Sequence, residues 1–229
     1  MTAPELPEAV VHPLALQLQK LGDRTARQVL QLLDQLDSGM IRPAQLPELA
    51  AVLVKLGADQ AAALTLGELV RELADAGAPA GALPPVAGVT AHSTLSGAEL
   101  AAGTVMAGPA DQRRTRLERL ARGAVARAGQ DSREQAIARS PLVEGWTRGL
   151  DSTACELCRW WWREGRVWPK SHHMPRHPGC TCVQVPKLVR ELVGVSREAA
   201  DDSAERRELD RAGRYLAAFG TGRRHITSQ

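Results

Sequence analysis

The chain has 229 residues, enough for one large or two small domains, which excludes a many-domain assembly. Hydrophobic residues make up 44% and charged residues 24% of it, both close to the globular average, so the chain as a whole is neither disordered nor fibrous. The net charge of +3 and the pI near 8.9 are mildly basic and do not by themselves identify a nucleic-acid-binding protein.

Neither a secretion signal nor a membrane helix is expected from the sequence. The first residues, Met1 to Val11, contain Glu5 and Glu8 but no lysine or arginine, so they lack the positive start of a secretory signal. The longest apolar run, Leu49 to Val54, is far below the roughly 20 residues that a membrane helix needs. We therefore expect a soluble protein in a reducing compartment, where cysteines are candidates for metal ligands before disulfides.

Three helices are predicted in the N-terminal third. Apolar residues recur at three- and four-residue steps from Leu14 to Leu36, which indicates an amphipathic helix. A short helix over Leu49–Leu56 is expected to stop at Gly57. A third helix follows from about Asp59 to Ala76, closed by Gly77.

Helical patterns return after a segment that is dense in alanine, glycine and proline. One helix is expected between Ser96 and Gly129, and Asp131 is a candidate N-cap for another that Pro141 interrupts. A highly charged helix is predicted from Ser196 to about Phe219. The resulting fold class is mainly α, with this order: an N-terminal helical part (1–76), a linker (77–92), a helical core (93–190) that ends in a small zinc-stapled β-ribbon, and a charged C-terminal helix and tail (191–229).

The candidate metal ligands lie within 28 residues, over the segment 155–182. Cys155 and Cys158 have the two-residue spacer of zinc knuckles, while Cys180 and Cys182 are one residue apart and follow His177. Five candidates exceed the four places of a tetrahedral structural zinc site, so one must be a neighbour and not a ligand. Two disulfides, or four thiols without metal, are the alternatives.

The spacing of the second cysteine pair suggests a strand, because side chains two residues apart share one face. That strand would end at Pro186 and pair with residues around Arg166–Trp168 in a two-stranded ribbon clamped by the metal. His172 and His173 are adjacent and point in different directions on any regular backbone, so we leave them out of the ligand set.

Two further groups are candidate contact sites. One is a set of arginines on the predicted helix over 111–127, which is either a solvated helix surface or a contact for phosphate or an acidic partner. The other is a run of three tryptophans, which is either a cover for the metal cluster or a partner-binding patch, and at least one of its indoles should be exposed. Trp146 is expected to pack the preceding helix against the ribbon. The candidate contact residues are Arg113, Arg114, Arg116, Arg119, Trp160, Trp161 and Trp162.

No strong catalytic pattern is present in the sequence. It contains neither a Gly-x-Ser-x-Gly nucleophile motif nor a glycine-rich phosphate loop with lysine. A His-metal type nuclease would use His172, His173 or His177 with a divalent metal apart from the structural zinc, and the Cys-x-Cys spacing fits it poorly. We predict no enzymatic activity.

The order of motifs in the central third resembles a known family. The motifs are Gly145-Trp146-Thr147-Arg148, Cys155-x-x-Cys158, a turn centred on Gly165, and His177-Pro178-Gly179-Cys180-Thr181-Cys182. This stretch, from about Arg122 to Pro186, resembles the minor head (head morphogenesis) proteins of tailed phages similar to protein F of phage Mu, particularly those of phages that infect actinobacteria. The chain departs from many members in its Trp160–Trp162 run.

The resemblance implies a low-copy virion protein in the capsid interior near the portal, made in the host cytoplasm and active in head assembly, DNA packaging or DNA ejection. It implies the portal protein, the major capsid or scaffold protein and packaged double-stranded DNA as partners, with no membrane. Some relatives are described as capsid maturation proteases, a role for which this sequence offers no catalytic residues. The alternatives are a free-standing zinc-containing DNA-binding protein and the nuclease.

Overall fold

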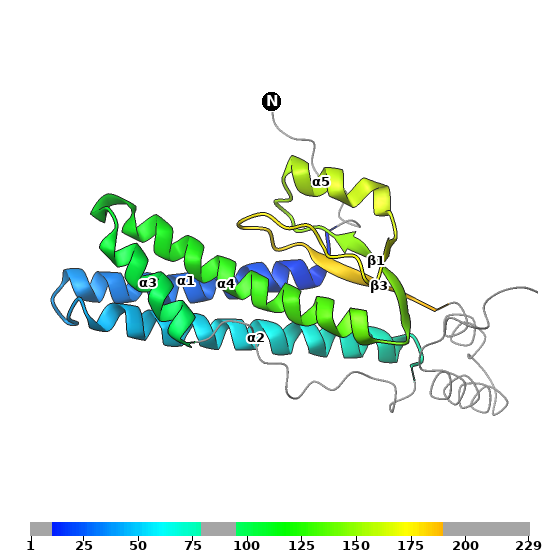
Figure 1. Cartoon of the computed structure of the whole chain (residues 1–229), viewed down its shortest axis with the longest axis horizontal. Helices are drawn as coiled ribbons and strands as arrows, with labels where there is room; N and C mark the ends of the chain where they lie inside the picture. Colours follow the sequence, from blue (N-terminus) through cyan, green and yellow to red (C-terminus); the bar gives the residue numbers. More distant parts are fainter. Residues whose placement is uncertain (1–10, 79–94, 190–229) are drawn as a thin grey trace, which may run out of the picture.

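The computed structural model describes residues 11–78 and 95–189. Nearly all of the predicted linker (77–92) and the whole predicted C-terminal helix and tail (191–229) lie outside these residues. The described part is mainly helical with a small sheet, as the sequence predicts. Figure 1 shows three long helices side by side, with the sheet and a short helix over one end. The elements are α1 (Pro13–Asp37), α2 (Gln45–Asp75), α3 (Leu95–Ala107), α4 (Ala110–Arg139), β1 (Val143–Gly149), α5 (Glu156–Trp162), the 3-10 turn η3 (Arg163–Gly165), β2 (Trp168–Pro169) and β3 (Val183–Leu188).

The first helix lies where the sequence predicts it. Its N-cap is His12, whose Nδ1 accepts a hydrogen bond from the backbone N–H of Leu14 at 3.3 Å, and Pro13 occupies the first helical position. The backbone N–H of His12 also donates to the carbonyl of Leu150 at 2.9 Å. The start of α1 is thereby fixed to the end of β1.

The two helices predicted over 49–56 and 59–76 are a single helix, α2, so the predicted stop at Gly57 is wrong. Gly57 lies where α2 crosses its neighbours: a Cβ there would lie 2.4 Å from Oγ1 of Thr25 and 3.0 Å from Cγ2 of Val125. The glycine serves close packing against α1 and α4, and the many alanine and leucine residues around it maintain the helix. Gly77, with φ of 84°, does end α2 as predicted.

The predicted break between two helices near Asp131 is also wrong. The chain breaks instead at Gly108-Pro109, and α4 then continues to Arg139, just before Pro141. Asp131 does not cap a helix because its carboxylate pairs with the guanidinium of Arg176. A tertiary ion pair thus replaces the local capping bond that the sequence suggests.

The helices pack through leucine, valine and alanine, as the scarcity of aromatic residues predicts. One cluster combines buried residues of α1, α2, α3 and α4, including Val29, Val54, Ala102 and Leu117. Helices on both sides of residues 79–94 therefore share one core. The described parts of the two predicted segments, 1–76 and 93–190, thus pack against each other.

Among the described helices, α2 alone is long and apolar enough to cross a membrane by length and composition. Half of its most apolar window is buried against the other helices. Helices buried in the core of soluble proteins share this length and apolar composition.

The sheet has three strands in the order β2-β1-β3, and both pairs are antiparallel. The predicted ribbon is therefore wrong in three respects. The central strand β1, which contains Trp146, was not predicted, and residues 166–168 do not pair with the cysteine segment, because Trp168 pairs with Trp146. The last strand also begins after the cysteines and continues through Pro186, whose missing N–H is tolerated on an edge strand.

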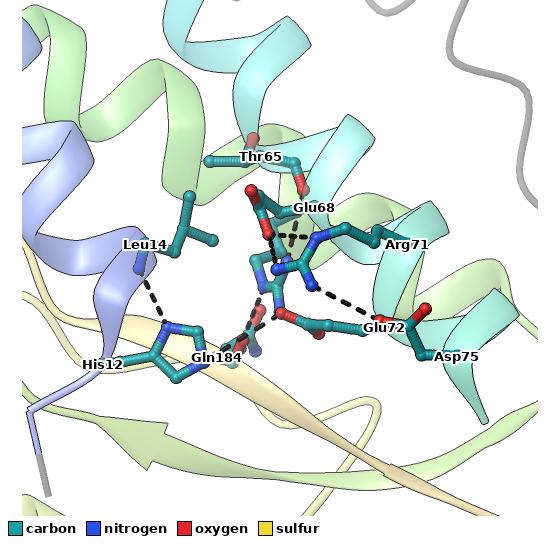
Figure 2. Close-up of polar contacts among 9 residues, drawn as sticks. His12, Leu14, Thr65, Glu68, Arg71, Glu72, Asp75 and Gln184 are labelled. Atoms are coloured by element: carbon teal, nitrogen blue, oxygen red, sulfur yellow. Dashed lines mark hydrogen bonds and ion pairs between the residues drawn. The ribbon is translucent and has the colours of Figure 1, made fainter. Parts of the chain in front are cut away.

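A buried polar cluster joins the bundle to the sheet. Arg133 of α4, 1% exposed, donates to the carbonyl of Gln184 in β3 at 2.6 Å and pairs with the carboxylate of Glu72 in α2 at 2.5 Å. Figure 2 shows Glu72 between His12 and the Glu68–Arg71–Asp75 side chains of α2. The cluster fixes α1, α2, α4 and β3 relative to one another, and it positions the segment that precedes β3.

Candidate metal centre

Two turns bring four of the five predicted ligands together. Cys155 is the N-cap of α5, and Cys158 lies in the first turn of that helix. His177 to Cys180 form a tight turn, in which the N–H of Cys180 donates to the carbonyl of His177 at 3.1 Å. Gly179, with φ of 84°, supplies the left-handed conformation that a turn after proline requires. The sequence His-Pro-Gly-Cys therefore places the imidazole and the thiol on one side of the turn.

The ligand atoms form two overlapping groups that share Cys158. Nε2 of His177 lies 3.2 Å from Sγ of Cys155 and 3.1 Å from Sγ of Cys158. Sγ of Cys158 lies 3.7 Å from Sγ of Cys180. In each of the two groups, which include all five predicted residues, the ligand atoms lie within 4.8 Å of one another, so each group could hold a metal ion: Cys155, Cys158 and His177; Cys158, Cys180 and Cys182.

Cys182 differs from the other cysteines because it has a carboxylate partner. Its Sγ donates to Oδ2 of Asp151 at 3.7 Å. The same oxygen accepts hydrogen bonds from the backbone N–H and the hydroxyl of Thr181, at 3.3 and 2.9 Å. Asp151 itself is 4% exposed. This contact holds Cys182 at the inner side of the cluster and fixes the path of the chain into β3.

A buried arginine faces the thiols. Arg148 of β1 is 2% exposed, and its Nη2 lies 3.5 Å from Sγ of Cys158 and 3.4 Å from Sγ of Cys180. Its Nη1 donates to the carbonyl of Pro175 at 2.9 Å. Within residues 11–78 and 95–189, no carboxylate forms an ion pair with it, and the negative charges that act on it are those of cysteines. A buried guanidinium needs a counter-charge, and thiolates are the groups in place to supply it.

The protonation of the thiols follows from these contacts. Hydrogen bonds from Cys158 and Cys182, supported by the guanidinium of Arg148, lower the pKa of the Cys180 thiol far below its ordinary value. The pKa of Cys158 is raised by the bond it shares with Cys180, and the pKa of Cys182 by its bonds to both. These contacts favour a thiolate at Cys180 beside protonated Cys158 and Cys182, and binding of a cation would release those protons.

Helix α4 is hydrogen-bonded to the backbone of the cysteine segment through one buried side chain. The side-chain amide of Gln130, 5% exposed, donates to the carbonyls of Cys180 and Cys182 at 2.9 and 2.8 Å. A single buried amide thus satisfies two carbonyls that no strand pairs. The cysteine segment is attached to the helical bundle through this residue and through Arg133.

His172 and His173 lie outside the cluster. The ring of His172 stacks on Trp168 with centroids 4.5 Å apart. Nδ1 of His173 lies 2.6 Å from a carboxylate oxygen of Glu134, whose other oxygen accepts from Arg176 at 2.9 Å. Among the described residues, neither His172 nor His173 belongs to a group that could hold a metal.

The three tryptophans of α5 face different surroundings. Trp160 is 59% exposed, as predicted for at least one of them, and Arg163 stacks on it at 4.7 Å. Trp161 lies 5.1 Å from the guanidinium carbon of Arg148, and Trp162 packs on the cluster of buried cysteines. The run therefore combines a cover for the cluster with one indole at the surface.

The four predicted contact arginines do not form one surface. Arg114 pairs with Asp34 of α1, and Arg116 donates to Gln112 at 2.6 Å within α4. Arg113 is half-buried, whereas Arg119 is exposed and borders a groove. Their helical spacing distributes them over more than one face of α4.

Sequence reasoning missed Asp151, Gln130 and the role of Arg148. The contacts of the first two with the cysteine segment span 30 residues or more, so no local pattern reveals them. Arg148 was part of the motif on which the resemblance rests, and only the fold shows that it faces the thiols. Comparisons of this chain with protein-family models, with curated proteins and with solved structures find no match.

Proposed function

We propose that this chain is a structural, zinc-stapled minor head protein of a tailed phage, associated with the portal inside the capsid. One observation carries the proposal: the separate motifs of the resemblance meet in space. Arg148 from the first motif contacts Cys158 from the second and Cys180 from the third. Motifs that converge on one site act as a unit, which favours a common origin over chance similarity.

The proposed ligands of zinc are Cys155, Cys158, His177 and Cys180. In a tetrahedron with zinc bonds of ordinary length, two sulfurs lie about 3.8 Å apart, and a sulfur and a nitrogen about 3.6 Å. The 3.7 Å between Cys158 and Cys180 matches the first value, whereas His177 lies 3.1 to 3.2 Å from two sulfurs, closer than the second, so zinc would need these two overlapping groups to adjust around it. Cys182 remains with Asp151 as a hydrogen-bond donor next to the metal.

This ligand set favours a structural role for the metal. Three thiolates and one imidazole fill the tetrahedron and leave no open position for a reactive water. Zinc with three thiolates has one excess negative charge, which the buried Arg148 would balance. The small sheet has little apolar core, and zinc binding supplies on the order of 10 kcal/mol of folding free energy in small domains.

Native mass spectrometry with and without a strong chelator tests the metal. We expect one zinc per chain and four reduced cysteines. Cys182→Ser should keep the zinc, because a serine hydroxyl can still donate to Asp151, whereas Cys180→Ser should lose it. Loss of zinc in Cys182→Ser with retention in Cys180→Ser would assign the fourth position to Cys182. A chain without metal and with two disulfides would refute the centre.

Association with a portal tests the virion role. The chain should co-purify with the portal protein encoded in the same genome when the two are co-expressed, and it should form a stable complex with the assembled ring. A genome that carries no portal or capsid gene near this one would contradict the proposal. Failure to bind the ring, with the zinc centre intact, would leave a zinc-stapled protein without a head function.

One observation favours the nuclease as a second candidate function. The side chain of His173 is 91% exposed, and its Nδ1 contacts Glu134, which is 11% exposed, so the carboxylate orients an imidazole toward solvent. Oriented imidazoles of this kind act as general bases. If the chain cuts plasmid DNA with added Mg²⁺, cleavage should disappear in His173→Gln and persist in His172→Gln. Equal loss in both variants would point to damaged packing.

A further inference from the structure

A groove runs along α4 beside the candidate metal centre. It has a volume of about 880 Å³ and lies between α1, α4 and the turn that carries His177 and Cys180. A second groove, of about 540 Å³, lies on the other side of the same ridge of α4, facing α2 and α3. Helix α4 packs against both α1 and α3, and Figure 1 shows the segment between β2 and β3 above α4. The two grooves share Arg119, Gly123, Arg127 and Asp131.

The charges in the larger groove are unbalanced toward positive. Arg122 pairs with Asp23 at 2.8 Å and with Glu118 at 3.0 Å, and Arg176 pairs with Asp131 and Glu134. Arg119 and Arg127 are exposed, and in the described part of the chain no carboxylate pairs with either. Two guanidinium groups are thus available for an anion.

The spacing of these two arginines sets the size of the ligand. They are eight residues apart on one helix, which places them about 12 Å apart along its axis. This spacing suits a ligand that offers one anionic group to each arginine. Gly123 lies halfway between them, and a Cβ at this position would meet nothing within 4 Å. An extended polyanion can therefore approach the helix backbone between the two guanidinium groups.

We propose that this ridge and groove bind the phosphate backbone of double-stranded DNA, through Arg119 and Arg127. Guanidinium groups match phosphate geometry, and contacts to the backbone need no pockets for bases. The lining contains no phenylalanine, tyrosine or tryptophan, and Leu18 is its one large aliphatic side chain. Peptides are anchored by apolar pockets, and single strands by aromatic stacking, so this lining favours a duplex backbone over either.

The turn from His177 to Cys180 forms one side of the groove, so the groove and the candidate metal centre share residues. His177, Pro178, Gly179 and Cys180 line the groove, and two of them are proposed ligands of zinc. The inference deepens the proposed function, since it names the surface that would touch packaged DNA. Binding of DNA and capture of a portal ring are separate measurements, and either can fail while the other succeeds.

The sharpest test places a charge at Gly123. Gly123→Glu puts a carboxylate four residues from each arginine, into open space, and Gly123→Gln adds the same volume without charge. Fluorescence anisotropy with a labelled duplex of 20 base pairs should show a loss of affinity of about tenfold or more in Gly123→Glu and little change in Gly123→Gln. An equal effect of both variants, or no effect of either, would overturn the proposal.

Salt dependence provides the second readout. In the double variant Arg119→Ala/Arg127→Ala, the slope of log affinity against log salt should fall by about 1.8, because two phosphate contacts are lost. The control Arg27→Ala removes an exposed arginine of α1 that lies outside the groove. An unchanged slope in the double variant would overturn the assignment. Equal binding of poly-glutamate and duplex, at matched charge, would show a site for acidic peptide and refute DNA as the ligand.

Discussion

Nη2 of Arg148 lies 3.4 Å from Sγ of Cys180, in a position where neither residue is in contact with bulk water. A guanidinium stays protonated at any ordinary pH, so its burial is favourable only beside negative charge. The thiolate that the surrounding contacts favour at Cys180 supplies that charge. Arg148 and the centre therefore stabilise each other, and each explains why the other is buried.

Replacement of Arg148 should weaken metal binding without removing a ligand. We expect Arg148→Met to bind zinc about 10 to 100 times more weakly, because groups that surround metal ligands have effects of this size. Competition with a zinc chelator of known affinity measures the change. Arg163→Met is the matched control, since Arg163 stacks on the exposed Trp160 and does not contact the thiols. Equal affinity of Arg148→Met and wild type would show that the thiols do not need the guanidinium.

Removal of the metal should cause the sheet and α5 to unfold at a lower temperature than the helical bundle. All five tryptophans fall between Trp146 and Trp168, so their fluorescence reports on the sheet and α5, whereas circular dichroism at 222 nm reports mainly on α1, α2 and α4. With a chelator, we expect a red shift of the fluorescence at a temperature where most of the helical signal remains. A simultaneous loss of both signals would mean that the bundle depends on the metal.

Local patterns predicted the mainly helical fold and the residues of the cysteine–histidine cluster, and failed where tertiary packing decides. The periodic apolar residues of α1 and the Cys-x-x-Cys pair are signals contained in a few neighbouring residues. Gly57 has the local signature of a helix end, but its place at a crossing of helices outweighs that signature. The register of β1 with β3 depends on residues some 40 positions apart, which no single segment reveals.

The stability of the fold should depend on pH through His12. Burial, with the nearby positive charge of Arg133, lowers the pKa of His12 from 6.5 to about 4, against an opposing effect of Glu68. The neutral ring is favoured in the folded state, so this contribution is complete above pH 6.5 and is lost as the pH falls from 6.5 toward 4. We expect a loss of roughly 1 to 2 kcal/mol, reduced because the ring is partly exposed.

Chemical denaturation of wild type and His12→Asn at several pH values measures this effect. Asparagine can still cap α1 but does not titrate, so the difference in stability between the two proteins should change between pH 7 and pH 4.5. A constant difference over this range would show that the imidazole is not responsible. Glu72, 4.0 Å from the ring, has a pKa raised by burial and titrates in both proteins.

Alanine at two glycines of the bundle should have opposite effects on stability. Both Gly57 and Gly123 lie inside helices, so alanine gains about 1 kcal/mol of helix propensity at each. At Gly123 the new Cβ meets nothing within 4 Å, and Gly123→Ala should raise the free energy of unfolding by about that amount.

At Gly57 the Cβ would lie 2.4 Å from Oγ1 of Thr25, and the helices must separate to accept it. Because overpacking of this kind costs about 1 to 3 kcal/mol, Gly57→Ala should be destabilising despite its gain in propensity. Urea denaturation of both variants distinguishes the outcomes, and stabilisation of both would contradict the close crossing of α2 with α1.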